Sequence, residues 1–196
     1  VLGQRDKPLT SEMNRNPTNP YGAFKASGEL LCGTYYNTYG IKALPARFSN
    51  VFGKFSGHKD SLVSKYIKSA LSYQDFVVNG NGLQVRDFVF VERLCEQIEN
   101  LGNILENALY EPAVHISSGR GLKVMEMISL INKSLEKFDI EPPKIKLGKQ
   151  ESHDINKCVA IPSRDLMPGG VEFQNKIKEG LDQTVEWFIQ RKLRGM

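Results

Sequence analysis

The chain has 196 residues, of which 40% are hydrophobic and 24% charged, as in a globular protein with one sizeable core; a disordered or solenoid class is excluded. The formal net charge of +4 is small and the basic residues are scattered, so we expect no nucleic-acid partner. No apolar run reaches transmembrane length and no signal-peptide pattern begins the sequence, so we expect no membrane association and a cytoplasmic location.

Helices and strands are predicted to alternate along the chain. Helices are expected at 20–39, 59–72, 91–108, 122–137 and 177–192. Strands are expected at 43–48, 76–79, 87–90 and 113–116. This alternation is typical of α/β layers.

The first predicted helix carries a tyrosine and a lysine one turn apart. Pro20 suits the first turn of a helix, so Tyr21 and Lys25 should share one face. A free phenol titrates near a pKa of ~10, but a neighbouring cation favours its phenolate form. The spacing therefore predicts a tyrosine able to act as a general acid or base. The alternative is that Tyr21 packs at the helix start and Lys25 is a solvated charge.

Cysteines and histidines indicate no metal site. The three cysteines, Cys32, Cys95 and Cys158, are odd in number and widely spaced, which fits neither a disulfide framework nor zinc. We therefore expect reduced thiols. Of the histidines, His115 is expected to pack beside its strand, and His58 and His153 to lie at the surface.

Further motifs follow in order along the chain. Ser49-Asn50-Val51-Phe52-Gly53 continues the strand at 43–48, and a segment at 78–91 joins two glycines to Arg86-Asp87-Phe88. A strand-glycine-helix pattern begins at Val114. The glycine pairs Gly80/Gly82 and Gly119/Gly121 lack the third glycine of a dinucleotide-binding turn, so they are interpreted as tight turns.

This order of motifs resembles the catalytic and substrate-binding half of the extended short-chain dehydrogenases/reductases, in the NAD-dependent nucleotide-sugar epimerase/dehydratase family. The similarity covers nearly the whole chain. It implies an α/β fold with a partial Rossmann-like, doubly wound sheet that lacks its N-terminal βαβ units, and a smaller α/β substrate-binding region. Residues 1–53 would belong to the nucleotide-binding domain, and residues 54–196 mostly to the region that binds the nucleotide sugar.

The resemblance also implies a reaction. In such enzymes NAD takes a hydride from a sugar carbon while a tyrosine removes the hydroxyl proton, and the transient keto sugar is then reduced on its other face or dehydrated. Tyr21 would be this acid/base. Lys25 would favour its phenolate and hydrogen-bond the cofactor ribose, and the backbone around Phe48 would lie near the nicotinamide.

Four further positions match substrate-binding residues of the family. Asn50 would contact the substrate, and Arg86 would hold the nucleotide diphosphate with its planar donor fork. Leu62 and Asn79 would line the base-binding site. Two alternatives stay open: Asn50 could cap a turn, and Arg86 could form a surface ion pair with Asp87.

The resemblance bears on partners as well. Val1-Leu2-Gly3 resembles a tripeptide that follows the strand with the family's catalytic serine or threonine, so we expect the cofactor-binding half on a preceding segment or another chain. A homodimer is expected, with Leu31, Tyr35 and Tyr36 at its surface unless these side chains are core. The chain alone is expected to be inactive. Two other functions remain: a non-catalytic nucleotide-sugar-binding or interaction module, and a reductase of a non-sugar ketone.

Overall fold

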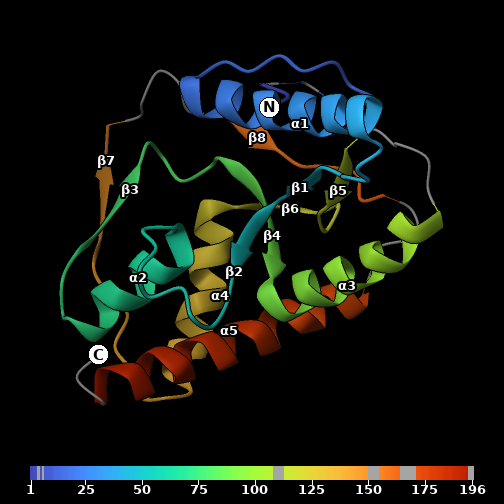
Figure 1. The fold of residues 1–196 in the computed structure, drawn as a ribbon. Helices are drawn as coiled ribbons and strands as arrows, with labels where there is room; N and C mark the ends of the chain where they lie inside the picture. The colour runs from blue at the N-terminus through green and yellow to red at the C-terminus, as the bar shows by residue number, and fades with distance from the viewer. Residues whose placement is uncertain (4, 6, 108–112, 150–154, 164–170, 194–196) are drawn as a thin grey trace.

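Helices and strands alternate in the structure, which confirms the predicted α/β class (Figure 1). The computed structural model describes residues 1–196 except 4, 6, 108–112, 150–154, 164–170 and 194–196. The helices are α1 (Pro20–Tyr39), α2 (Leu62–Leu71), α3 (Val91–Asn107), α4 (Val124–Glu136) and α5 (Val171–Leu193). The strands are β1 (Ala46–Phe48), β2 (Asn50–Phe52), β3 (Phe76–Asn79), β4 (Val85–Phe90), β5 (Val114–Ile116), β6 (Gly121–Lys123), β7 (Ile145–Gly148) and β8 (Lys157–Cys158).

The predicted helices all form, and α1 has the predicted ends. The helix expected from residue 122 begins later, because residues 121–123 form β6 instead. The strands β2, β6, β7 and β8 were not predicted. Each has two to four residues, too few to show a period of alternating side chains.

The strands form three small sheets. β1 pairs with β5 in parallel, placing Ala46 opposite Val114. β2 and β8 pair with β4 in parallel, and β6 pairs with β4 antiparallel. β3 pairs with β7 in parallel. Figure 1 shows α1 on one side of these strands and α5 on the opposite side.

Two hydrophobic clusters hold these layers together. The larger one lies among α2, α4, α5 and the strands β2, β3 and β4, and its fully buried side chains include Tyr66, Ile131 and Leu181. The phenol of Tyr66 donates to Asn132 Oδ1 at 2.8 Å, which satisfies its buried hydroxyl. The smaller cluster joins α3 to β4 and β5 through residues such as Val89 and Ile116. The division of the chain at Gly53 stays a prediction.

Glycines form turns where the sequence predicts them. Gly82 and Gly119 have φ angles of 71° and 72°, the left-handed region in which other residues are strained. At Gly82 a side chain would also meet Met125 Sδ at 2.9 Å. Turn geometry and close packing therefore account for Gly82 without a bound phosphate.

A buried carboxylate ties the centre of β4 to the loop between β5 and β6. Asp87 is 1% exposed, and its Oδ1 accepts hydrogen bonds from the backbone N–H of Ser118 at 2.9 Å and from Ser118 Oγ at 2.6 Å. Its Oδ2 accepts from the N–H of Gly119 at 3.1 Å. Burial raises the pKa of Asp87 to about 6, and the hydrogen bonds from Ser118 and Gly119 only partly oppose this.

Stability should therefore carry an unusual pH dependence from Asp87. Between the ordinary pKa of 3.8 and the folded value of about 6, the native state binds more protons than the unfolded state, so this contribution falls as pH rises. At 1.36 kcal/mol per pKa unit, the loss between pH 4 and pH 7 is about 2 kcal/mol. Asp87→Asn removes it, so the unfolding free energy of the wild type relative to this variant should decrease by that amount from pH 4 to 7 in urea titrations.

The matched control is Asp75→Asn. A hydrogen bond from Lys146 lowers the pKa of Asp75, so the wild type should become more stable relative to this variant as pH rises. A pH-independent difference between the wild type and Asp87→Asn would contradict the assignment of a raised pKa to Asp87.

Candidate active site

Local sequence sets both ends of α1. The side chain of Asn19 caps the helix by accepting the N–H of Gly22 at 2.8 Å, and Pro20 occupies the first turn. Gly40 ends the helix in a left-handed conformation, with its N–H bonded to the Tyr36 carbonyl at 2.8 Å. The residues of the tyrosine–lysine motif therefore occupy the N-terminal turns of a well-capped helix.

Tyr21 and Lys25 lie together at the surface. The Nζ atom of Lys25 is 5.5 Å from the centre of the Tyr21 ring and 5.7 Å from the centre of the Phe24 ring. Tyr21 is 72% exposed, so its packing at the helix start, the alternative interpretation, is wrong. A cation next to an accessible phenol is the arrangement that favours proton exchange with a bound hydroxyl group.

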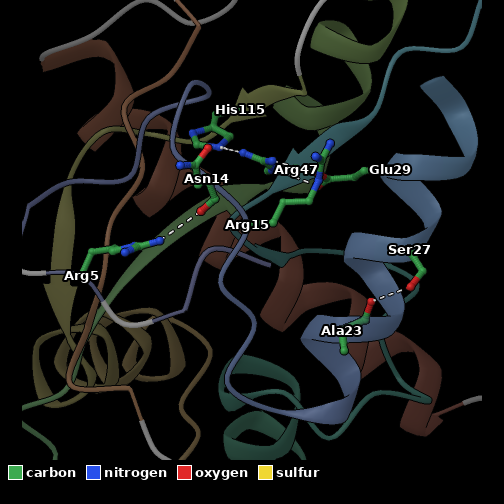
Figure 2. A network of polar contacts seen from close by, with 8 residues as sticks. All are labelled: Arg5, Asn14, Arg15, Ala23, Ser27, Glu29, Arg47 and His115. Atoms are coloured by element: carbon green, nitrogen blue, oxygen red, sulfur yellow. Dashed lines mark hydrogen bonds and ion pairs between the residues drawn. The ribbon is translucent and has the colours of Figure 1, made fainter. Parts of the chain in front are cut away.

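The buried face of α1 rests on an ionic cluster around Glu29 (Figure 2). Glu29 Oε1 accepts from Arg47 Nε at 2.7 Å, and Glu29 Oε2 accepts from Arg47 Nη2 and from Arg15 Nε, each at 2.8 Å. The side chains of Glu29 and Arg47 are 7% and 13% exposed. This two-pronged contact joins α1 to β1, and Arg15 adds the segment that precedes α1.

His115 completes the cluster from β5, as Figure 2 shows. Its Nε2 lies 3.2 Å from Arg47 Nη1, and because a guanidinium can only donate, Nε2 accepts and the ring is neutral. Burial lowers the pKa of His115, and the charge of Arg47 lowers it further. For Glu29, burial works to raise the pKa, but the hydrogen bonds from Arg47 and Arg15 outweigh it and hold the pKa below its ordinary value.

Gly22 brings Val1 close to the first turn of α1. A side chain at Gly22 would lie 3.3 Å from Pro17 Cβ and 3.4 Å from the backbone nitrogen of Val1. The N–H of Asn16 donates to the carbonyl of Val1 at 2.9 Å, which closes the segment between them into a loop. The small residue at position 22 thus leaves room for Pro17 and Val1 beside the start of α1.

Phe48 and Asn50 occupy neighbouring strands. Phe48 ends β1, directly after Arg47, and is 49% exposed. Asn50 begins β2, and its Nδ2 donates to the carbonyl of Asp87 in β4 at 3.0 Å. Asn50 therefore bridges two strands, and the alternative that it caps a turn is wrong.

Arg86 lies in β4 next to this bridge. It is half-buried, and its Nη1 donates to the carbonyl of Val85 at 3.0 Å. Its neighbour Asp87 is buried and bonded to Ser118 and Gly119, so the alternative of a surface ion pair between Arg86 and Asp87 is wrong. Two of the predicted substrate-binding residues, Asn50 and Arg86, thus come from paired strands.

Asn79 and Leu62 lie at the ends of two other elements, β3 and α2. Asn79 ends β3, and its carbonyl accepts from Gln84 Nε2 at 2.8 Å. Leu62 begins α2 and packs partly buried against the larger core cluster. Within the described part of the chain, no hydrogen bond or ion pair joins either residue to Tyr21 or Lys25.

Glu29, Arg47 and Gln84 are polar residues of the site that the sequence did not single out. The spacing of Glu29 is a sequence signal for its burial, since it shares a helical face with the small buried residues of α1. Gln84 is buried, and its Oε1 has no hydrogen-bond partner among the described residues. The absence of a metal site stays a prediction. Among the described residues, no group of three or more His, Cys, Asp or Glu side chains could hold a metal ion. None of the described helices is long and apolar enough to cross a bilayer.

Comparison with known proteins shows the family and the fold. The profile of the NAD dependent epimerase/dehydratase family matches residues 1–99. An uncharacterized protein of Methanocaldococcus jannaschii is 30% identical over 98% of this chain and 57% of its own length. The human dTDP-D-glucose 4,6-dehydratase is 23% identical over 95% of this chain and 53% of its own length. The chain therefore spans about half the length of the curated relatives it matches.

Solved structures agree with this assignment. UDP-N-acetylglucosamine 4-epimerase from Methanobrevibacter ruminantium has a TM-score of 0.82 and 26% identity, covering 97% of this chain and 60% of its own. UDP-glucose 4-epimerase from Thermotoga maritima shares the fold, with a TM-score of 0.78 and 23% identity, covering 97% of this chain and 60% of its own. The described architecture is that of the Rossmann-like epimerases over part of their length. From its matched motifs, its fold and its relatives, the chain belongs to the NAD dependent epimerase/dehydratase family.

Proposed function

We propose that this chain forms the catalytic and substrate-binding half of an NAD-dependent nucleotide-sugar epimerase or dehydratase, with Tyr21 as its acid/base. The observation that carries the proposal is the contact between the Lys25 ammonium and the exposed ring of Tyr21 at the start of α1. The family assignment supports the reaction class.

The residues present fit one end of the cofactor. Tyr21 and Lys25 are exposed polar groups on α1, and the ionic cluster ties that helix to β1, which ends at Phe48. These groups suit the ribose and the nicotinamide. The sequence has no Gly-x-Gly-x-x-Gly turn to receive the pyrophosphate, and a preceding segment or another chain is proposed to supply that part. When bound, NAD supplies the acceptor and donor of the hydride.

The protein's part in the chemistry is proton transfer and positioning. The Tyr21 oxygen takes the proton from the sugar hydroxyl as the carbon–hydrogen bond is oxidised to a ketone, and returns it when the ketone is reduced. The Lys25 ammonium, which lies over the Tyr21 ring, is proposed to assist this proton transfer. The Lys25 ammonium carries three N–H donors, which can also bond the cofactor ribose.

The substrate is proposed to lie against β2, β3 and β4. The guanidinium of Arg86 suits diphosphate oxygens. On the paired strand, the side-chain carbonyl oxygen of Asn50 accepts no hydrogen bond within the described part of the chain and can receive a sugar hydroxyl. Asn79 and Leu62, at the end of β3 and the start of α2, are proposed to line the site of the base.

A homodimer is proposed through α1. Leu31 and Tyr35 are about half exposed or more, so the alternative that they are core residues is wrong, whereas Tyr36 is half-buried. Phe24 is exposed in register with them, and the three side chains form an apolar stripe. Such a stripe is suited to pack against a second copy of the helix.

The reaction class is tested with the full-length product of the gene that contains this chain. Supplied with NAD and UDP- or dTDP-sugars, it should convert one of them to an epimer or a 4-keto-6-deoxy product, whereas residues 1–196 alone should show no turnover. Binding of UDP without turnover would favour a non-catalytic module. Turnover of a non-sugar ketone in its place would favour a reductase.

Tyr21→Phe should lower kcat of the full-length product by about 10²- to 10⁴-fold, since it removes the group that exchanges the proton. Tyr39→Phe is the matched control because Tyr39 is an exposed tyrosine on the same helix, and it should leave kcat unchanged. Steady-state assays with the converted nucleotide sugar measure both. Equal rates for Tyr21→Phe and the wild type would remove Tyr21 from the mechanism.

Arg86→Lys should weaken UDP binding by about tenfold, since an ammonium retains the charge but loses the two-pronged contact with phosphate oxygens. Isothermal titration calorimetry of the full-length product with UDP measures the dissociation constant. Arg93→Gln is the control, because Arg93 pairs with Glu96 on α3 and is not proposed to touch the ligand. Unchanged UDP affinity in Arg86→Lys would show that Arg86 does not bind the diphosphate in the proposed way.

A further inference from the structure

We propose that Glu29 is the positioning residue of this site, and that its carboxylate, through Arg47, fixes the helix of Tyr21 and Lys25 to the strand that ends in Phe48. The inference rests on the proposed function, since it assigns the way in which the acid/base and the nicotinamide-binding strand keep one geometry. Glu29 itself touches neither group and acts through the placement of α1.

Helix α1 buries few side chains other than that of Glu29. The buried residues of the helix are Gly22, Ala26, Glu29 and Gly33. Two glycines and an alanine bury almost no side-chain apolar area, so the hydrophobic effect gives this face little hold on the strands below it. Glu29 is the one side chain of the buried stripe that can make strong directional contacts.

The contact between Glu29 and Arg47 has a directional geometry. Both oxygens of Glu29 are engaged by the guanidinium of Arg47, at 2.7 and 2.8 Å, and Oε2 also accepts from Arg15. A two-pronged contact fixes the angle between a carboxylate and a guanidinium as well as their separation. An apolar contact of equal area would leave α1 free to slide or turn along β1.

The contact between Glu29 and Arg47 lies close in the chain to both groups that it would align. Glu29 is one helical turn after Lys25 and two turns after Tyr21, and Arg47 directly precedes Phe48. Arg47 is itself held from the other side by His115 Nε2 at 3.2 Å, within the β1–β5 pair. The cluster therefore spans the short path between the proton-transfer groups and the strand proposed to face the nicotinamide.

The proposed substrate-binding residues Asn50 and Arg86 make no hydrogen bond to the cluster of Glu29, Arg47 and His115 within the described part of the chain. Asn50 is bonded to β4, and Arg86 lies within β4, whose partners are β2, β6 and β8. Loss of Glu29 should consequently misplace the acid/base without disturbing the hold on the nucleotide. Because a displacement of about 1 Å can cost about 10²-fold in rate, the expected signature is a fall in kcat with an unchanged KM.

The test uses Glu29→Gln and Arg47→Lys in the full-length product. Glu29→Gln keeps the shape of the side chain but loses its charge and one acceptor, and Arg47→Lys keeps the charge but loses the fork. Both should lower kcat by about 10- to 100-fold, with KM for the nucleotide sugar changed less than twofold. The control is Asp182→Asn, which breaks contacts of Asp182 with Ser134 and Lys137 between α4 and α5 and should leave kcat unchanged.

A second readout does not require activity. Amide hydrogen exchange of residues 20–39 should become faster in Glu29→Gln than in the wild type, while α4 and α5 keep their protection; Asp182→Asn should do the reverse. If the wild type shows no turnover, the proposed function fails while this measurement still decides the attachment of α1. Unchanged exchange in α1, or equal falls in kcat for Glu29→Gln and Asp182→Asn, would overturn the positioning role.

Discussion

The structure around the candidate site depends on one buried carboxylate. Glu29 receives two arginines that come from different parts of the chain, one before α1 and one in β1. A buried charge left without its partners costs far more than the pair contributes, so the helix, the strand and the preceding segment must remain together. The exposed side chains of Tyr21 and Lys25 are on the same helix, so their position depends on this buried contact.

The two halves of the site are held by different physical means. Around the larger cluster, α2, α4 and α5 bury aromatic and branched side chains against β2, β3 and β4 in a packed core. Around α1, small residues and hydrogen-bonded charges replace that packing. Under the proposed function, the packed core would hold the nucleotide sugar and the ion-paired helix would carry the acid/base, so affinity and rate would depend on different contacts.

The sequence predicted the long elements well and the short ones poorly. The limits of α1 follow from Asn19, Pro20 and Gly40, which act through local capping, so no tertiary information was needed. Strands such as β8 have two residues and exist only because β4 is there to pair with them. The same division holds for the site: the Tyr21–Lys25 contact is local along one helix, whereas Glu29 meets Arg47 and His115 only through the fold.

The packing of Val1 against the first turn of α1 constrains anything attached upstream. Gly22 leaves room for the backbone nitrogen of Val1, and the bond from Asn16 keeps that end of the loop in place. A polypeptide joined to that nitrogen would begin beside Gly22, the residue that follows Tyr21. A larger side chain at position 22 would press against Pro17 and Val1, so the glycine sets how closely Val1 can approach the helix.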